Sequence, residues 1–118
     1  MSTVELNVSL RAVDGPLYAQ IAAGIRRALQ DQAVSPGSVI QTAGRLAESL
    51  GVNVNTALRA YRSLADEGLL RLRRGHGPVV RIGPDQMALH QLANDLAREA
   101  ARMGLSRGEL VALVLQYA

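Results

Sequence analysis

The sequence has no cysteine, no lysine, no tryptophan and no phenylalanine. Without cysteine the chain can form no disulfide, no thiolate metal site and no thiol nucleophile. Its only aromatic residues are Tyr18, Tyr61 and Tyr117, so a core must be built from Leu, Ile, Val and Ala. No apolar run approaches the roughly 18 residues of a membrane span, and no signal-like segment opens the chain. We therefore expect a cytoplasmic protein.

Charge is unevenly distributed along the chain. The 118 residues are 48% apolar and 19% charged, which is typical of a folded domain. Residues 45–81 hold seven arginines and three acids, whereas the remainder holds six arginines and seven acids. Such a basic segment fits a polyanionic partner, because arginine neutralises phosphates. A solvated surface laced with salt bridges would have the same composition.

The apolar pattern predicts a mostly α fold with a small β-wing (α+β). Strict alternation over residues 4–10 predicts a half-buried strand. A helix should follow Asp14, a possible cap, and Pro16, and it should stop by the breakers at 35–37. Two apolar runs within 69–82 surround a glycine-rich turn, which predicts a hairpin with a basic tip.

Two short helices joined by a tight turn are expected between these parts. Thr42 can cap the first, which closes at Gly51, and Asn53 can cap the second, over residues 53–66. The glycine relieves the corner, so the pair matches a helix-turn-helix. In the second helix the spacing turns one set of side chains inward: Val54, Ala57, Leu58, Tyr61, Leu64 and Ala65. The outward set is Asn55, Thr56, Arg59, Arg62 and Ser63.

Residues 84–118 predict a second, helical part of the chain. Pro84 can open one helix, Gly104 breaks it, and Ser106 with Glu109 forms an S-x-x-E capping box for another. A hairpin this short cannot bury its leucine-rich stripes alone. The stripes must pack on the preceding domain or on a second copy of the chain.

Several short motifs lie between about Gly15 and Ile82. They are Pro16-Leu17-Tyr18, Leu46-Ala47, Gly51-Val52-Asn53-Val54-Asn55-Thr56, Arg59-Ala60-Tyr61, Leu64, Glu67-Gly68-Leu69 and Arg73-Arg74-Gly75-His76-Gly77. With these motifs the chain resembles the GntR transcription regulators, and within them the short YtrA-like branch. The resemblance implies a winged helix-turn-helix domain over residues 1–83 and a two-helix dimerisation tail over 84–118.

The sequence departs from the family pattern at several positions, and the usual proline is absent. Such proteins usually have Leu-Pro-Ser, one variable residue and then Arg-Glu-Leu-Ala where residues 40–47 read Ile-Gln-Thr-Ala-Gly-Arg-Leu-Ala. Gly44 thus replaces the usual arginine, and Arg45 is the candidate substitute. Val54 stands where the wider family often has Arg and the YtrA-like branch often has Pro. Base recognition should then depend on Asn55, Thr56 and Arg59.

The resemblance places the second of these short helices in the major groove of DNA. There Asn55 can pair with adenine and Arg59 with guanine, while threonines near helix N-termini suit phosphates. Glycines at the wing tip would permit positive φ angles and a close approach to DNA. The predicted DNA-binding residues are Thr42, Arg45, Asn53, Asn55, Thr56, Arg59, Arg62, Arg74, Gly75, His76 and Gly77. Capping alone is the simpler role for Asn53, and an ordinary solvated hairpin would resemble the wing.

Catalysis has no candidate residues in this sequence. The two histidines, His76 and His90, have no metal-ligand spacing, and the acids are isolated. We therefore predict that the protein is not an enzyme and has no metal site and no cofactor. The sequence does not identify a small-molecule effector.

The function that the resemblance implies is sequence-specific regulation of transcription. We expect a repressor that binds a pseudo-palindromic double-stranded DNA operator as a homodimer. The dimer interface should contain apolar residues of the tail: Leu89, Leu92, Leu96, Leu110, Leu113, Val114 and Tyr117. The alternative is a winged-helix module for protein–protein contact, whose basic face meets an acidic partner.

Overall fold

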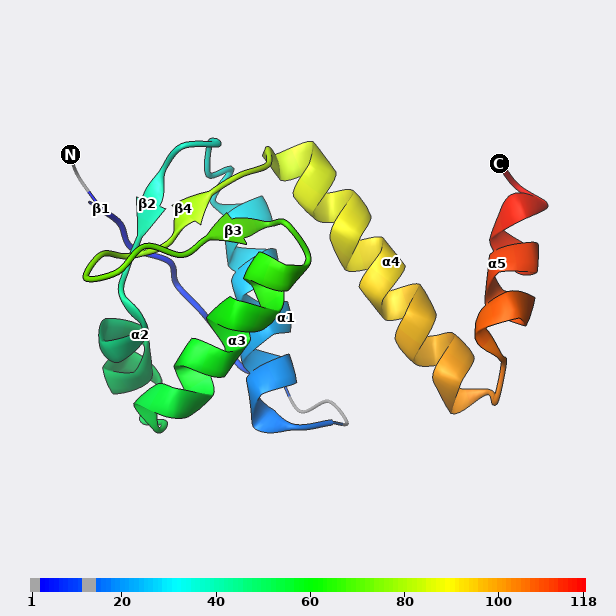
Figure 1. Cartoon of the computed structure of the whole chain (residues 1–118), viewed down its shortest axis with the longest axis horizontal. Coiled ribbons are helices and arrows are strands. Elements are labelled where there is room, and N and C mark those ends of the chain that lie inside the picture. Colours follow the sequence, from blue (N-terminus) through cyan, green and yellow to red (C-terminus); the bar gives the residue numbers. More distant parts are fainter. Residues whose placement is uncertain (1–2, 12–14) are drawn as a thin grey trace. The chain divides into compact units, whose positions relative to one another are not determined.

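A computed structural model describes residues 3–11 and 15–118 (Figure 1). Asp14, the predicted cap of the first helix, lies outside the described residues. The elements in chain order are β1 (Thr3–Val4), α1 (Leu17–Asp31), β2 (Val39–Ile40), α2 (Ala43–Leu50), α3 (Val54–Asp66), β3 (Leu70–Arg71), β4 (Val79–Val80), α4 (Pro84–Arg102) and α5 (Arg107–Leu115). This order is the predicted one, and it confirms the mostly α fold with a small sheet.

The helix-turn-helix is formed by α2 and α3, and its turn has the predicted chemistry. The Thr42 hydroxyl accepts a hydrogen bond from the backbone N–H of Arg45, 3.2 Å away, and so caps α2. Gly51 ends α2 with a φ of 67°, a left-handed conformation that suits glycine. The side chain of Asn53 then caps α3 by accepting from the N–H of Asn55 at 2.7 Å. The predicted caps Thr42 and Asn53 are confirmed.

The core lies where α1, α2, α3 and the sheet meet. Its largest fully buried side chain is that of Tyr61, whose hydroxyl donates to the Gln41 carbonyl oxygen at 2.7 Å. Burial raises the pKa of Tyr61 far above its ordinary value, and the Glu5 carboxylate raises it further. The hydroxyl therefore stays a proton donor. The aliphatic members packed around it include Ile21, Ile25, Leu29, Ile40, Leu46, Leu64, Leu69, Leu70, Val80 and Met87.

Helices α1 and α3 are also joined by a charged pair. Arg26 of α1 is 4% exposed, and its guanidinium lies 2.5 Å from the carboxylate of Glu67, the residue that follows α3. A buried guanidinium needs an anionic partner, because an unpaired charge is costly away from water. The pair thus fixes the end of α3 against α1.

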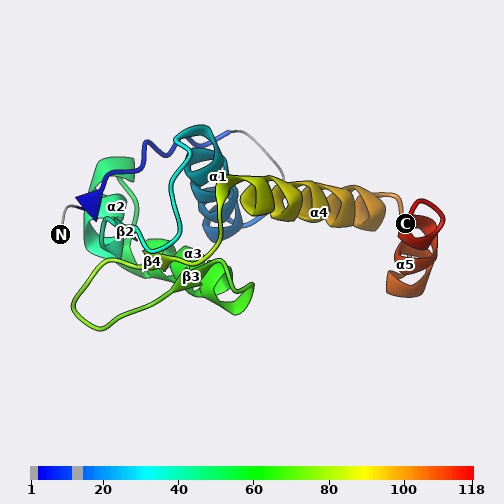
Figure 2. The ribbon, with the colours of Figure 1, turned by 90° about the horizontal axis from the view of Figure 1, so that it is seen from above.

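The four short strands form one sheet in the order β1, β2, β4, β3. Strand β1 runs parallel to β2, whereas β4 runs antiparallel to both β2 and β3. The loop between β3 and β4 is the predicted wing, and Figure 2 shows it extending beyond the helices. The sheet therefore carries the wing, and its strand β3 packs against α3.

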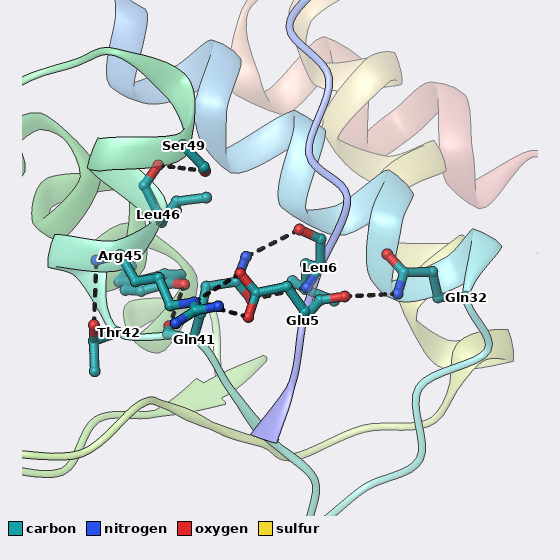
Figure 3. A network of polar contacts seen from close by, with 9 residues as sticks. Glu5, Leu6, Gln32, Gln41, Thr42, Arg45, Leu46 and Ser49 are labelled. Atoms are coloured by element: carbon teal, nitrogen blue, oxygen red, sulfur yellow. Dashed lines mark hydrogen bonds and ion pairs between the residues drawn. The ribbon is translucent and has the colours of Figure 1, made fainter. Parts of the chain in front are cut away.

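The predicted strand over residues 4–10 is mostly wrong, because only Thr3–Val4 pair with a neighbouring strand. The chain beyond Val4 is bound by side-chain amides instead (Figure 3). Gln41 accepts from the Leu6 N–H at 2.8 Å and donates to the Leu6 carbonyl at 2.9 Å. Gln32 similarly accepts from the Asn7 N–H at 2.8 Å and donates to the Glu5 carbonyl at 3.1 Å. The alternating pattern arises because Leu6 points into the core while Glu5 and Asn7 are exposed.

The chain divides into two compact units, residues 1–88 and 89–118. The division lies inside α4, and Met87 belongs to the core of the first unit. In the second unit, Ser106 and Glu109 form the predicted capping box at the start of α5, with the Ser106 hydroxyl 3.1 Å from the Glu109 N–H. Hydrogen bonds from Ser106 lower the pKa of Glu109, so its carboxylate remains a charged acceptor.

Candidate nucleic-acid interface

Helix α3 has one buried face and one exposed polar face. Ala57, Ala60, Tyr61 and Leu64 are buried, whereas Asn55, Arg59 and Arg62 are exposed and Thr56 is half-buried. This division follows from 3.6 residues per turn, and it puts the amide and guanidinium groups on the side away from the core.

One residue of α3 that was predicted to face the core is exposed instead. Val54 is 48% exposed, because it lies in the first turn of the helix, beyond the reach of the core. Leu58 and Ala65 are half-buried and border the apolar face. The exposed valine at the start of α3 adds apolar surface next to the polar side chains.

Arg59 has a partner that the sequence did not suggest. Its guanidinium carbon lies 3.9 Å from the centroid of the Tyr18 ring at the start of α1. This is a cation–π contact, in which the flat guanidinium covers the ring face. Tyr18 thereby limits the orientations of the Arg59 side chain. Two residues 41 positions apart could not be paired from spacing alone.

Arg45, the candidate substitute for the arginine missing at Gly44, is held by Glu5. Its Nε lies 3.0 and 3.2 Å from the two carboxylate oxygens of Glu5 (Figure 3). Both side chains remain largely exposed, at 68% for Arg45 and 46% for Glu5. The guanidinium that was predicted to contact DNA is therefore paired with a carboxylate of the same chain. The sequence analysis did not connect Glu5 with this position.

The tip of the wing is exposed and basic. Arg74, Gly75 and His76 are exposed, and the His76 N–H donates to the Arg73 carbonyl at 3.4 Å. Gly75 has a φ of 73°, as expected for a glycine that closes a tight turn.

Gly77 differs from the expectation for the wing tip. It does not adopt a positive φ, and it is buried at the base of the wing. A Cβ at this position would lie 1.7 Å from the Ile40 carbonyl oxygen. Glycine is therefore required because the wing crosses the backbone of β2 here, and the residue lies beneath the tip.

The unit of residues 89–118 contains an apolar groove of about 470 Å3 between α4 and α5. Five predicted interface residues line it: Leu89, Leu92, Leu96, Leu110 and Val114. Ala93, Val111 and Leu115 also line it, although the sequence analysis did not select them. Leu113 and Tyr117, which it did select, are exposed but are not part of the lining. The groove leaves large apolar side chains in water, with Leu89 and Leu92 each 66% exposed.

Other kinds of site are not found in the described part of the chain. Among residues 3–11 and 15–118, no three His, Asp or Glu side chains are close enough together to hold a metal ion. The helices in these same ranges are all too short or too polar to cross a membrane.

The amino-acid sequence matches a family model described as bacterial regulatory proteins, gntR family, over residues 17–80. It is 30% identical over 95 residues to the HTH-type transcriptional regulator Rv1152 of Mycobacterium tuberculosis, covering 80% of this chain and 78% of that protein. It is also 32% identical over 104 residues to the histidine utilization repressor of Pseudomonas aeruginosa, covering 88% of this chain but only 42% of the repressor. These relatives are regulators of transcription and not enzymes.

Solved structures show the same fold. A GntR family transcriptional regulator from Listeria monocytogenes superposes with a TM-score of 0.60 at 23% identity, covering 90% of this chain and 98% of that one. YtrA from Sulfolobus acidocaldarius, a GntR-family transcription factor, superposes with a TM-score of 0.56 at 28% identity, covering 76% and 97%. The likeness to YtrA agrees with the predicted YtrA-like branch. The chain therefore belongs to the gntR family of bacterial regulatory proteins, and it is a DNA-binding regulator of transcription.

Proposed function

We propose that the protein is a repressor that binds a pseudo-palindromic operator as a homodimer. A regulator of this kind acts in the cytoplasm and blocks transcription by occupying its operator. One relative, from Pseudomonas aeruginosa, is named a repressor, which supports this direction of regulation. The observation that carries the proposal is the exposed polar face of α3, which the buried face anchors to the core.

In this proposal α3 lies in the major groove with its first turns at the base edges. Asn55 and Arg59 read bases, since Asn pairs with adenine and Arg with guanine through two hydrogen bonds each. Thr56 and Arg62 contact phosphates, and the Thr42 hydroxyl, which still has a proton to donate, contacts another. Asn53 acts through its cap, which sets the start of α3.

The wing provides a second, less selective contact in the proposed complex. Arg74 and His76 reach a phosphate or the minor groove, whose negative potential attracts cations. Gly75 lets the backbone turn tightly enough to approach the DNA, and Gly77 supports the wing from below. These contacts add affinity and carry little sequence information.

The proposed dimer forms through the apolar groove of residues 89–118. A cluster of exposed leucines and valines of this size is unfavourable in water, and a second copy would cover it. Two-fold symmetry then presents two copies of α3 to half-sites about one DNA turn, or a multiple of it, apart. That geometry is the reason for expecting a pseudo-palindromic operator.

Selection of DNA fragments from a random pool, followed by gel shifts at several salt concentrations, tests the proposal. The selected sequence should have two related halves, and it should bind roughly a thousandfold more tightly than random DNA. The logarithm of affinity should fall linearly with that of salt concentration, by about 0.9 per phosphate neutralised. Absence of any selected sequence, or binding that ignores salt, would contradict DNA recognition. A reporter transcribed at an unchanged or higher rate when the operator is occupied would contradict repression.

A further inference from the structure

The position of Glu5 is fixed by hydrogen bonds on both of its sides. The amide of Gln41, a residue only 2% exposed, binds both backbone groups of Leu6, and Gln32 binds the Glu5 carbonyl (Figure 3). Gln32 also accepts a hydrogen bond from the Asn7 N–H. Leu6 itself is buried in the core. The Glu5 side chain is thus attached to an anchored backbone and is directed to one place on the surface.

That place is beside the start of α2. Both Glu5 carboxylate oxygens contact the Nε of Arg45, at 3.0 and 3.2 Å. The two residues share a shallow hollow of about 280 Å3, whose lining also includes Thr42 and Gly77. The hollow therefore brings together the helix cap, the base of the wing and the one arginine of α2.

We infer that Glu5 competes with DNA phosphate for Arg45, and so sets how tightly the protein holds DNA of any sequence. The inference rests on the proposed function, in which Thr42, in the same hollow as Arg45, contacts a DNA phosphate. A carboxylate and a phosphate offer the same guanidinium the same kind of charged oxygen acceptor. When a phosphate approaches Arg45, the Glu5 carboxylate has to give up part of its own interaction with the guanidinium. The net gain from the phosphate contact is therefore reduced.

The expected size of this effect is modest. Both side chains are largely exposed, and an exposed ion pair of this kind contributes little because water and salt screen it. Removing the competitor should strengthen binding by about two- to fivefold. Because phosphate contacts carry no sequence information, the factor should be the same on operator and on random DNA.

The test compares Glu5→Gln with Glu48→Gln in the full chain. Glu48 is an exposed acid on α2, near Arg45, so its substitution removes the same charge without removing the ion pair. Affinities for the selected operator and for a random duplex are measured over a range of salt. We expect Glu5→Gln to strengthen both by about two- to fivefold and to steepen the salt dependence, with a clearly smaller change for Glu48→Gln. In an Arg45→Ala background the Glu5→Gln effect should disappear.

Three results would overturn the inference while leaving DNA binding intact. They are equal effects of Glu5→Gln and Glu48→Gln, a Glu5→Gln effect that persists in Arg45→Ala, and an effect confined to the operator. Loss of salt-dependent binding in the unsubstituted protein would instead refute the proposed function. Thermal unfolding of each variant checks that the N-terminal segment stays in place, because a detached segment would lower the melting temperature.

Discussion

The ring of Tyr18 supports the guanidinium of Arg59, with 3.9 Å between the guanidinium carbon and the ring centroid. Stacking uses the flat face of the guanidinium, whereas guanine is bound by the N–H groups at its edge. The two contacts are therefore compatible. In the proposed complex, Tyr18 of α1 thus orients Arg59 of α3 for base recognition, although Tyr18 itself need not touch DNA.

Tyr18→Leu should weaken operator binding by about two- to fivefold, because Arg59 loses the surface that orients it. Tyr18→Phe keeps the aromatic face and should bind nearly as well as the unsubstituted protein. Gel shifts with both variants, alone and combined with Arg59→Ala, measure the effect. The proposed role of Tyr18 is wrong if Tyr18→Leu and Tyr18→Phe bind the operator equally well. It is also wrong if Tyr18→Leu still lowers operator affinity in the Arg59→Ala background.

Arg59→Ala and Arg74→Ala should differ in what they change. Loss of a bidentate contact to a base should cost about 1–3 kcal/mol on the operator and less on random DNA, so Arg59→Ala should reduce discrimination. Arg74→Ala should weaken both DNAs equally and lower the salt slope by about 0.9. Titrations of both variants on both DNAs decide between these roles. Equal losses on both DNAs for both variants would reject the division.

Gln41→Leu should destabilise the fold by about 2–4 kcal/mol, because it leaves the buried N–H and carbonyl of Leu6 without partners. Gln32→Leu is the matched control: it removes a similar pair of hydrogen bonds at an exposed site, where water replaces them. It should cost less than about 1 kcal/mol. Urea unfolding followed by circular dichroism measures both. Equal losses of unfolding free energy in the two variants would mean that the burial of Gln41 does not increase the cost of removing its hydrogen bonds.

Gly77→Ala should disrupt the base of the wing. The added Cβ would lie 1.7 Å from the Ile40 carbonyl oxygen, so backbone must move, at a cost of about 3 kcal/mol. Gly75→Ala meets no described atom within 4 Å, and it should cost only the roughly 1 kcal/mol of a left-handed alanine. Thermal unfolding compares them. A larger drop in melting temperature for Gly75→Ala than for Gly77→Ala would show that a small backbone shift removes the clash at position 77.

Leu92→Glu should convert the proposed dimer into monomers, because it places a charge in the apolar groove. Met103→Glu provides the control, since Met103 is 65% exposed and does not line the groove. Light scattering should give twice the monomer mass for the unsubstituted protein and for Met103→Glu, and the monomer mass for Leu92→Glu. A Leu92→Glu protein that remains dimeric would exclude the groove as the interface.

The local signals in the sequence predicted the helices well. Thr42 and Asn53 identified the starts of α2 and α3, and Ser106 with Glu109 identified the start of α5. These signals work because a cap depends on residues within one turn of it. The polar face of α3 could be predicted for the same reason, since it follows from periodicity within a single helix.

The features that the sequence did not predict depend on contacts between residues that are distant in the chain. Alternation at the N-terminus indicated which side chains are buried, but it could not reveal that Gln41 and Gln32 replace a neighbouring strand. The Glu5–Arg45 and Tyr18–Arg59 pairs likewise depend on how separate elements pack. In the tail, helical spacing selected Leu113 and Tyr117, which do not line the groove between α4 and α5, because spacing does not say which stripe faces the other helix.

The hydrogen bonds from Gln41 and Gln32 to the N-terminal segment affect how the residues of that segment are aligned with the core. Two strands joined by a backbone ladder can slip by two residues and still keep the same side chains inside. Here the amides of Gln41 and Gln32 bind the backbone of residues 5 to 7, and the buried Leu6 side chain decides which residues those are. The alignment is thus independent of the outward side chains. A substitution at position 5 should therefore leave the segment in place, so that the charge beside α2 can change separately from the fold.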